Sequence, residues 1–155
     1  MVLLTGPRQV GKTTLAKGLM ARYPNAQYLN WDVADDRRIL LAQTWSPRAD
    51  ILVFDEIHKM SQWKSYLKGV YDGRTAGQAI LVTGSARMET FRQSGESLAG
   101  RYFPAHLHPF SVREWIELTG ARPDDALDRL MERGGMPEPF LAESKIGAER
   151  WRRQY

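Results

Sequence analysis

The sequence predicts an α/β fold in which helices cover both faces of a parallel β-sheet of about five strands. Three observations predict this fold. Strand-like runs alternate with helical segments, which favours parallel strands joined by right-handed crossovers. Two of the runs are apolar throughout, as strands buried on both faces are. Polar residues follow several strands, and these positions meet at the carboxyl edge of a parallel sheet, where ligands bind.

The predicted elements begin almost at the first residue. The strands are expected at residues 2–5, 26–32, 50–56, 78–85 and 102–110. The helices are expected at residues 13–23, 36–43, 61–72, 111–118 and 124–133. No internal repeat or low-complexity tract interrupts this order.

The first half of the chain supplies three strands and two helices. The run VLLT leads into a glycine-bounded loop, and the helix behind it places Leu15, Leu19 and Met20 on one face. The stretch AQYLNWD alternates as a strand does, and a short helix follows it. The run DILVFDE is apolar until two carboxylates end it, which is typical of a fully buried strand.

The second half begins with an amphipathic helix and a second apolar strand, QAILVTGS. The apolar residues of that helix recur near a spacing of 3.6: Trp63, Tyr66, Leu67, Val70 and Tyr71. The run YFPAHLHPF is a weaker strand, because Pro104 confines it to a sheet edge or a bulge. Two helices close the chain, and Ser111 with Glu114 three residues later forms a capping pattern at the first of them.

Composition sets the broad class of protein. The chain of 155 residues fits one domain with its own core, and 43% of its residues are hydrophobic. It has no cysteine, which excludes a disulfide framework, a thiolate nucleophile and cysteine-ligated zinc. The spacing of His58, His106 and His108 gives no helical i, i+4 pair and argues against a metal site built on histidine.

Charge and hydropathy indicate the cellular location and the kinds of partner to expect. No segment approaches the roughly 20 apolar residues of a membrane span, and no signal peptide pattern is present, so a cytoplasmic protein is expected. The net charge is +4, from 22 basic and 18 acidic residues. That excess is compatible with nucleic acid, but no basic-aromatic stripe or helix-turn-helix pattern accompanies it.

The loop after the first strand carries the strongest motif. It reads G-x-x-x-x-G-K-[ST], and the residues expected to hold a nucleotide are Gly6, Pro7, Arg8, Gln9, Val10, Gly11, Lys12, Thr13 and Thr14. Its glycines let backbone amides turn toward phosphate oxygens, and Lys12 reaches the β- and γ-phosphates. The Thr13 hydroxyl is expected to ligate Mg²⁺, and the helix beginning there presents its positive end to the same anion. The loop therefore predicts a P-loop NTPase.

Two carboxylates end the apolar strand in the middle of the chain. Asp55 fits the Walker-B role of holding Mg²⁺, either directly or through a second shell. Glu56 is placed to polarise a water for attack on the γ-phosphorus. The alternative is that both acids simply end a strand in solvent.

A third element follows the next strand, in LVTGSAR. The Ser85 hydroxyl is expected to contact the γ-phosphate or the attacking water, as at the sensor-1 position of AAA-type ATPases. The alternative is a serine that caps a turn. Arg87 is a weaker candidate for a further phosphate contact.

Five blocks carry a family resemblance: LLTGPRQVGKTTL, ILVFDEIHKMSQWKSYLKGVYD, ILVTGSAR, SLAGRYFPAHLHPFSVREW and GGMPEPFL. In that order they resemble the prokaryotic AAA-type ATPases of the broad ATPase family that carries a C-terminal domain of unknown function. The resemblance covers nearly the whole chain, and the combination of blocks is more specific than the P-loop alone.

The resemblance implies an AAA-like three-layer sandwich followed by the start of a helical lid. It implies a P-loop ATPase core at residues 1–118, and at 119–155 the start of the lid and a linker to a missing C-terminal domain. Family members begin before the first strand and continue past the last block, so a fragment is expected here, and adenine recognition often uses the missing N-terminal segment. His58 occupies a commonly polar position and is expected at the surface.

The Gly-Arg block resembles an arginine-finger region, which makes Arg101 the candidate for a further cation on the γ-phosphate. Gly100 frees the backbone before it, and the edge strand follows at once, a location that faces a neighbour more readily than the chain's own pocket. We expect Arg101 to act in trans in a homo-oligomer. The alternative is a salt bridge to Glu96 or to a surface carboxylate.

The favoured function is binding of ATP and Mg²⁺-dependent ATP hydrolysis, coupled to a conformational output or to an unidentified protein or nucleic-acid partner. One alternative is a nucleotide-gated interaction module with little turnover. A second is a P-loop kinase for small molecules, and the Asp55-Glu56 pair favours hydrolysis over that class.

Overall fold

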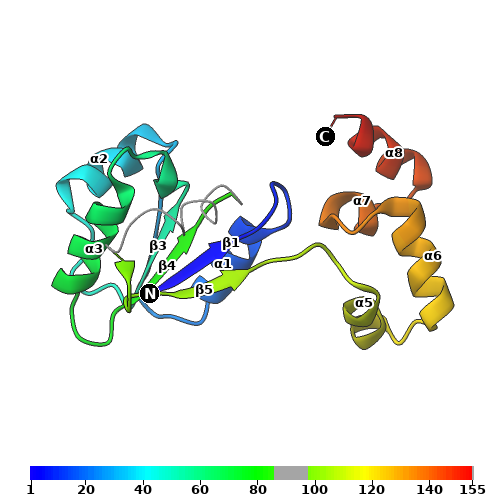
Figure 1. The fold of residues 1–155 in the computed structure, drawn as a ribbon, viewed down its shortest axis with the longest axis horizontal. Helices are drawn as coiled ribbons and strands as arrows, with labels where there is room; N and C mark the ends of the chain where they lie inside the picture. Colours follow the sequence, from blue (N-terminus) through cyan, green and yellow to red (C-terminus); the bar gives the residue numbers. More distant parts are fainter. Residues whose placement is uncertain (86–97, 155) are drawn as a thin grey trace. The chain divides into compact units, whose positions relative to one another are not determined.

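The computed structural model of the chain describes residues 1–85 and 98–154 and contains the expected α/β fold (Figure 1). The strands are β1 (Val2–Thr5), β2 (Ala26–Asn30), β3 (Ile51–Asp55), β4 (Ala79–Thr83) and β5 (Phe103–His106). The α-helices are α1 (Lys12–Met20), α2 (Ala34–Ala42), α3 (Trp63–Gly73), α5 (Val112–Thr119), α6 (Pro123–Arg133), α7 (Pro137–Leu141) and α8 (Lys145–Gln154), with a 3₁₀ turn η1 (Ile57–Lys59) after β3.

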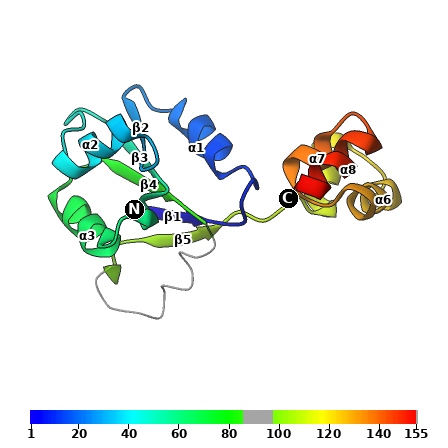
Figure 2. The ribbon, with the colours of Figure 1, turned by 90° about the horizontal axis from the view of Figure 1, so that it is seen from above.

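The five strands form one parallel sheet in the order β2-β3-β4-β1-β5. Figure 2 shows β1 between β4 and β5. The edge position of β5 confirms the prediction made from Pro104, because a residue without an amide hydrogen is tolerated at a sheet edge. The order also inserts β4 between β1 and β3, so the segments that follow these three strands are neighbours.

Helices cover both faces of the sheet, which gives three layers. On one face Leu52, Phe54 and Val82 of the sheet pack with residues of α2 and α3. On the other face Val53 and Leu81 pack with residues of α1. Strand β3, which lies between β2 and β4, is buried at all five positions, as its continuous apolar run predicts.

The structure corrects some details of the sequence prediction. Helix α1 buries Ala16 completely and leaves Leu15 40% exposed, so Leu15 is not part of the face formed by Leu19 and Met20. The small Ala16 allows the helix to lie close to the sheet, and the larger leucine is displaced toward solvent. Strand β1 has the predicted bounds, whereas β2 to β5 are shorter than predicted, and helices α7 and α8 were not predicted.

Contacts divide the chain into two compact units. The first contains Met1–Gly6 and the chain from Lys12 to Leu107, and the second contains Pro7–Gly11 and the chain from His108 onward. The division of roles at residue 118 stays a prediction. Among residues 1–85 and 98–154, no helix is long and apolar enough to cross a membrane.

The helices of the second unit pack around an aromatic cluster. The rings of Phe110 and Trp115 lie 5.2 Å and 4.9 Å from the ring of Phe140. The Phe110 amide donates a hydrogen bond of 2.7 Å to the Gly135 carbonyl. A Cβ atom at Gly135 would lie 2.8 Å from the Phe110 carbonyl oxygen, so this close approach requires glycine.

The predicted capping pattern of α5 is confirmed. The Glu114 amide donates to the Ser111 hydroxyl, and the Ser111 amide donates to the Glu114 carboxylate at 2.9 Å. The Ser111 hydroxyl also donates to the Glu114 carboxylate, and this bond together with that from the Ser111 amide lowers the pKa of Glu114. Both hydrogen bonds of the capping box thus satisfy backbone N–H groups that have no acceptor within the first turn of the helix.

Candidate functional site at the carboxyl edge of the sheet

The strand register aligns three polar strand ends. Asn30 of β2, Asp55 of β3 and Thr83 of β4 pair in one row across the sheet, and Leu4 of β1 pairs with Thr83. Parallel strands present their carboxyl ends at the same edge. The residues that follow these strands therefore gather at the edge where the P-loop leaves β1.

The P-loop joins β1 to the first turn of α1. Lys12 is 8% exposed, and its ammonium donates a hydrogen bond of 3.0 Å to the Gly6 carbonyl, so the side chain lies back along the loop. Gly11 adopts a φ of 100°, a conformation that residues with a side chain rarely tolerate. Gln9 also has a positive φ.

The other P-loop residues differ in their exposure. Val10 is buried, whereas Arg8, Gln9, Thr13 and Thr14 are exposed. Exposed polar groups at the N-terminus of a helix are accessible to an anion.

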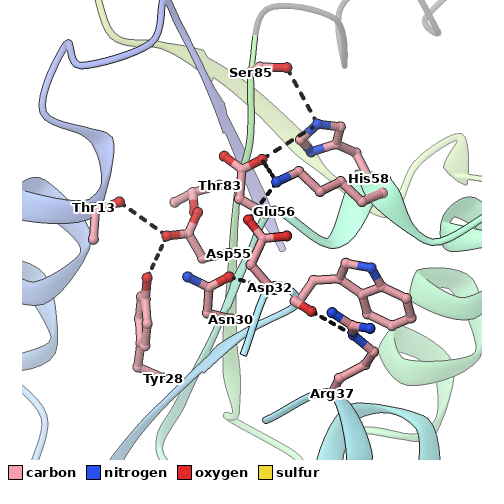
Figure 3. A network of polar contacts seen from close by, with 12 residues as sticks. Thr13, Tyr28, Asn30, Asp32, Arg37, Asp55, Glu56, His58, Thr83 and Ser85 are labelled. Carbon is pink, nitrogen blue, oxygen red and sulfur yellow. Dashed lines mark hydrogen bonds and ion pairs between the residues drawn. The ribbon is translucent and has the colours of Figure 1, made fainter. Parts of the chain in front are cut away.

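The Asp55 carboxylate is the centre of the polar network in Figure 3. It is 4% exposed and accepts hydrogen bonds from three side chains on three different elements. Thr13 of α1 donates to Oδ2 at 3.0 Å, and Thr83 of β4 donates to Oδ1 at 2.5 Å. Tyr28 of β2 donates to Oδ2 as well. A buried carboxylate requires such donors, because an unpaired charge is costly to bury.

Tyr28 and Thr83 were not among the residues predicted for the site. Burial and the hydrogen bond to the Asp55 carboxylate raise the pKa of Tyr28, so its hydroxyl stays protonated and acts as the donor. Thr83 is completely buried. Both residues act on Asp55 from the strands on either side of it.

Glu56 follows β3 directly and lies beside two basic side chains. Its backbone is left-handed, with a φ of 57°, and its side chain is 27% exposed. The Lys59 ammonium lies 3.4 Å from Glu56 Oε2 and 2.5 Å from the Asp32 carboxylate. His58 Nε2 lies 3.7 Å from the same Glu56 oxygen.

His58 connects Glu56 to Ser85. Its Nε2 atom lies 3.4 Å from the Ser85 hydroxyl, and dashed lines in Figure 3 join the ring to both side chains. The His58 side chain is only 11% exposed, so the prediction of a surface residue is wrong. Burial lowers the pKa of His58, which favours the neutral ring near neutral pH.

Ser85 therefore lies near Glu56, two residues beyond the end of β4. Arg87 lies outside the described residues.

Arg101 lies away from this cluster. It precedes β5 by two residues and so lies at the amino edge of the sheet, where the Phe103 amide donates to the Met1 carbonyl. Its guanidinium donates to both carboxylate oxygens of Asp72, at 2.8 Å and 3.2 Å. These hydrogen bonds lower the pKa of Asp72.

The oxygens gathered here suit a hard divalent cation. Thr13 and Asp55 supply a hydroxyl and a carboxylate, the ligand types that Mg²⁺ prefers in nucleotide sites. Within residues 1–85 and 98–154 there is no group of three or more His, Cys, Asp or Glu side chains that could hold a metal ion.

The model of a family described as AAA domain matches residues 1–116. Two uncharacterized proteins, from Mycobacterium bovis and Mycobacterium tuberculosis, are each 32% identical over 158 aligned residues. The match covers 100% of this chain and 34% of each relative, so the chain spans about a third of the length of these curated relatives.

Three solved structures share the fold. They are the Aeropyrum pernix Orc1 protein in complex with DNA, a RuvB variant of Thermotoga maritima, and the replication initiator DnaA bound to AMPPCP and single-stranded DNA. Their TM-scores are 0.57, 0.56 and 0.59, at 14%, 20% and 14% identity. The alignments cover 99%, 90% and 99% of this chain and 55%, 51% and 58% of those chains. Similarity at this level of identity describes the fold alone.

Proposed function

This chain belongs to the AAA domain family, and we propose that it binds ATP with Mg²⁺ and hydrolyses it to ADP and inorganic phosphate. The observation that carries the proposal is the hydrogen bond of 3.0 Å between Thr13 and Asp55. It joins the P-loop hydroxyl to a buried carboxylate 42 residues away in the sequence, and the two groups are those that such a site uses to hold magnesium.

The P-loop would bind the triphosphate. Its backbone amides and the positive end of α1 would face the phosphate oxygens. The Lys12 ammonium would give up its hydrogen bond to the Gly6 carbonyl and donate to a phosphate oxygen instead. Thr13 and Asp55 would hold Mg²⁺, which supplies positive charge that neutralises the phosphates. The family alignment ends at residue 116, close to the limit of 118 proposed for the ATPase core, and we propose residues 119–155 as the start of the lid.

Glu56 is proposed as the general base. Its carboxylate takes a proton from the attacking water, the water oxygen forms a bond to the γ-phosphorus, and the bond to the β–γ bridging oxygen breaks, which leaves ADP. Ser85 is proposed to orient the γ-phosphate or the water. The distances that join Ser85 to His58 and His58 to Glu56 support a common task for these side chains.

Arg101 is proposed to act in trans, across an interface with a second copy of the chain. It lies at the opposite edge of the sheet from Asp55, and its partner within the chain is Asp72. Its contribution to hydrolysis therefore requires an oligomer in which it leaves Asp72 for a neighbour's nucleotide. Orc1 and DnaA were solved with DNA, and we keep a nucleic acid, beside a protein, as a candidate partner for this chain.

A nucleotide-gated interaction module is the second candidate, and one observation favours it. Glu56 is paired with Lys59 and lies near His58, so the base is engaged within the chain. If Glu56 stays in these contacts when ATP is bound, the site would bind ATP with little turnover.

Replacement of Lys12 by alanine tests the nucleotide site. The variant loses a buried ammonium beside the Gly6 carbonyl, and charge-assisted hydrogen bonds to the phosphates are lost with it. We expect the affinity for mant-ATP to fall by about 100-fold, since hydrogen bonds to charged groups contribute up to ~3 kcal/mol. Fluorescence titration measures this change.

Lys68→Ala is the matched control, because Lys68 is an exposed lysine of α3 away from the P-loop. Its affinity for mant-ATP should equal that of the wild type. Equal affinity in Lys12→Ala would mean that the loop is not a nucleotide site.

A further inference from the structure

The Asp55 carboxylate is held at both oxygens by side chains other than the P-loop threonine. Thr83 donates to Oδ1 and Tyr28 donates to Oδ2, from the strands on either side of β3. Thr13 shares Oδ2 with Tyr28. If the Thr13 hydroxyl moves onto a metal ion, Tyr28 and Thr83 still hold one oxygen each, and the carboxylate keeps its orientation.

The position of Tyr28 is fixed by its own surroundings. It is the third residue of β2 and pairs with Val53 of β3. The ammonium of Lys17 lies 5.5 Å from the centre of its ring, and the ring packs against the core on the α1 face of the sheet. A ring held by its strand and by these contacts delivers its hydroxyl to one place, which is the Asp55 oxygen.

We propose that Tyr28 is a positioning residue of the metal site, which orients Asp55 to receive a divalent cation bound with a nucleotide. The proposal rests on the function proposed above for the identity of the ligand. Side chains that orient a metal ligand typically contribute 10-fold to 100-fold to metal affinity. A structural tyrosine would instead affect stability and leave metal affinity unchanged.

Tyr28→Phe tests the proposal without use of turnover. The experiment titrates Mn²⁺ into the protein at saturating AMP-PNP and follows free Mn²⁺ by electron paramagnetic resonance, with Mg²⁺ competition as a second readout. We expect Mn²⁺ to bind about 10-fold to 100-fold more weakly than to the wild type. The affinity for mant-ADP in EDTA should be unchanged, because Tyr28 has no role in phosphate binding.

Tyr66→Phe is the matched control. The Tyr66 hydroxyl donates a hydrogen bond of 2.6 Å to the Leu40 carbonyl, so this variant also loses one tyrosine hydrogen bond in the same unit, away from Asp55. It should bind Mn²⁺ as the wild type does. Thr83→Val removes the donor to the other oxygen while it keeps the shape of a buried side chain, and it should weaken Mn²⁺ binding in the same direction.

The outcomes separate the two proposals. If Tyr28→Phe binds Mn²⁺ with wild-type affinity while the wild type binds it with the nucleotide, the positioning role is wrong and the proposed function stands. If Tyr66→Phe weakens Mn²⁺ binding as much as Tyr28→Phe, the effect comes from general destabilisation and the positioning role is again wrong. A wild-type protein that binds neither AMP-PNP nor Mn²⁺ overturns the proposed function as well.

Discussion

Replacement of Arg101 by alanine should lower the rate of ATP hydrolysis by about 10³–10⁵-fold, the range over which an arginine finger acts in related P-loop enzymes. The affinity for ATP should change little, because Arg101 lies at the amino edge of the sheet and the P-loop leaves its carboxyl edge. Steady-state phosphate release and mant-ATP titration measure the two quantities.

Asp72→Asn is the matched control for this variant. Arg101→Ala and Asp72→Asn both weaken the same ion pair, but only the first removes the cation. Asp72→Asn should hydrolyse ATP at close to the wild-type rate. If the hydrolysis rate of Asp72→Asn falls as far as that of Arg101→Ala, the ion pair itself is needed, and Arg101 has a structural role beside α3.

A mixing experiment distinguishes action in trans from action in cis. Arg101→Ala and Glu56→Gln should each be inactive, and an equimolar mixture should recover part of the activity at sites that combine an intact Arg101 with an intact Glu56. Size-exclusion chromatography must confirm that the two variants assemble together. A co-assembled mixture without recovery would contradict action in trans.

Replacement of Glu56 by glutamine should lower the rate of hydrolysis by about 10²–10⁴-fold, the range of general base catalysis. Glutamine keeps the size of the side chain and loses the ability to accept the proton of water. The P-loop contact of Lys12 and the hydrogen bond of Thr13 to Asp55 do not involve Glu56, so binding of ATP and Mg²⁺ should stay unchanged. Single-turnover phosphate release separates the chemical step from binding.

Glu117→Gln is the control for the loss of a carboxylate. Glu117 forms an exposed ion pair with Arg113 on α5, and its replacement should leave hydrolysis unchanged. If Glu56→Gln hydrolyses ATP at the wild-type rate, another group must act on the water, and the mechanism proposed here is wrong.

The sequence predicted the fold and the edge of the sheet at which polar residues gather, because the signals are local. The P-loop pattern lies within eight residues, and the run before Asp55 and Glu56 marks a buried strand without reference to any other segment. The sheet order was not needed for these inferences, since all parallel strands end at the same edge.

The contacts of Asp55 could not be predicted in the same way, because they depend on which strands are neighbours. Tyr28 and Thr83 reach Asp55 from β2 and β4, and no local pattern states that these strands flank β3. A weak signal was present in both cases. Thr83 is a polar residue at the end of an apolar strand. Tyr28 lies two residues before Asn30, so the two side chains share one face of the strand, and Asn30 pairs with Asp55.

His58 and Leu15 illustrate a second limit. His58 was expected at the surface because the family it resembles commonly has a polar residue there, yet the 3₁₀ turn Ile57–Lys59 folds it back toward Glu56. Leu15 fits the apolar spacing of its helix, but the helix buries Ala16 in its place, because the smaller side chain lets the helix lie closer to the sheet. Both outcomes depend on tertiary packing rather than on residue type.

Hydrolysis of ATP at this site is tested most directly by measuring ADP and inorganic phosphate in the same reaction. Wild-type protein is incubated with ATP and Mg²⁺, with and without small-molecule phosphoryl acceptors, beside Lys12→Ala. We predict equal amounts of ADP and phosphate, no change with acceptors, and neither product above background with Lys12→Ala. ADP formed without an equal amount of phosphate would indicate transfer to an acceptor. Bound ATP with neither product would indicate a nucleotide-gated module, and either result would contradict hydrolysis.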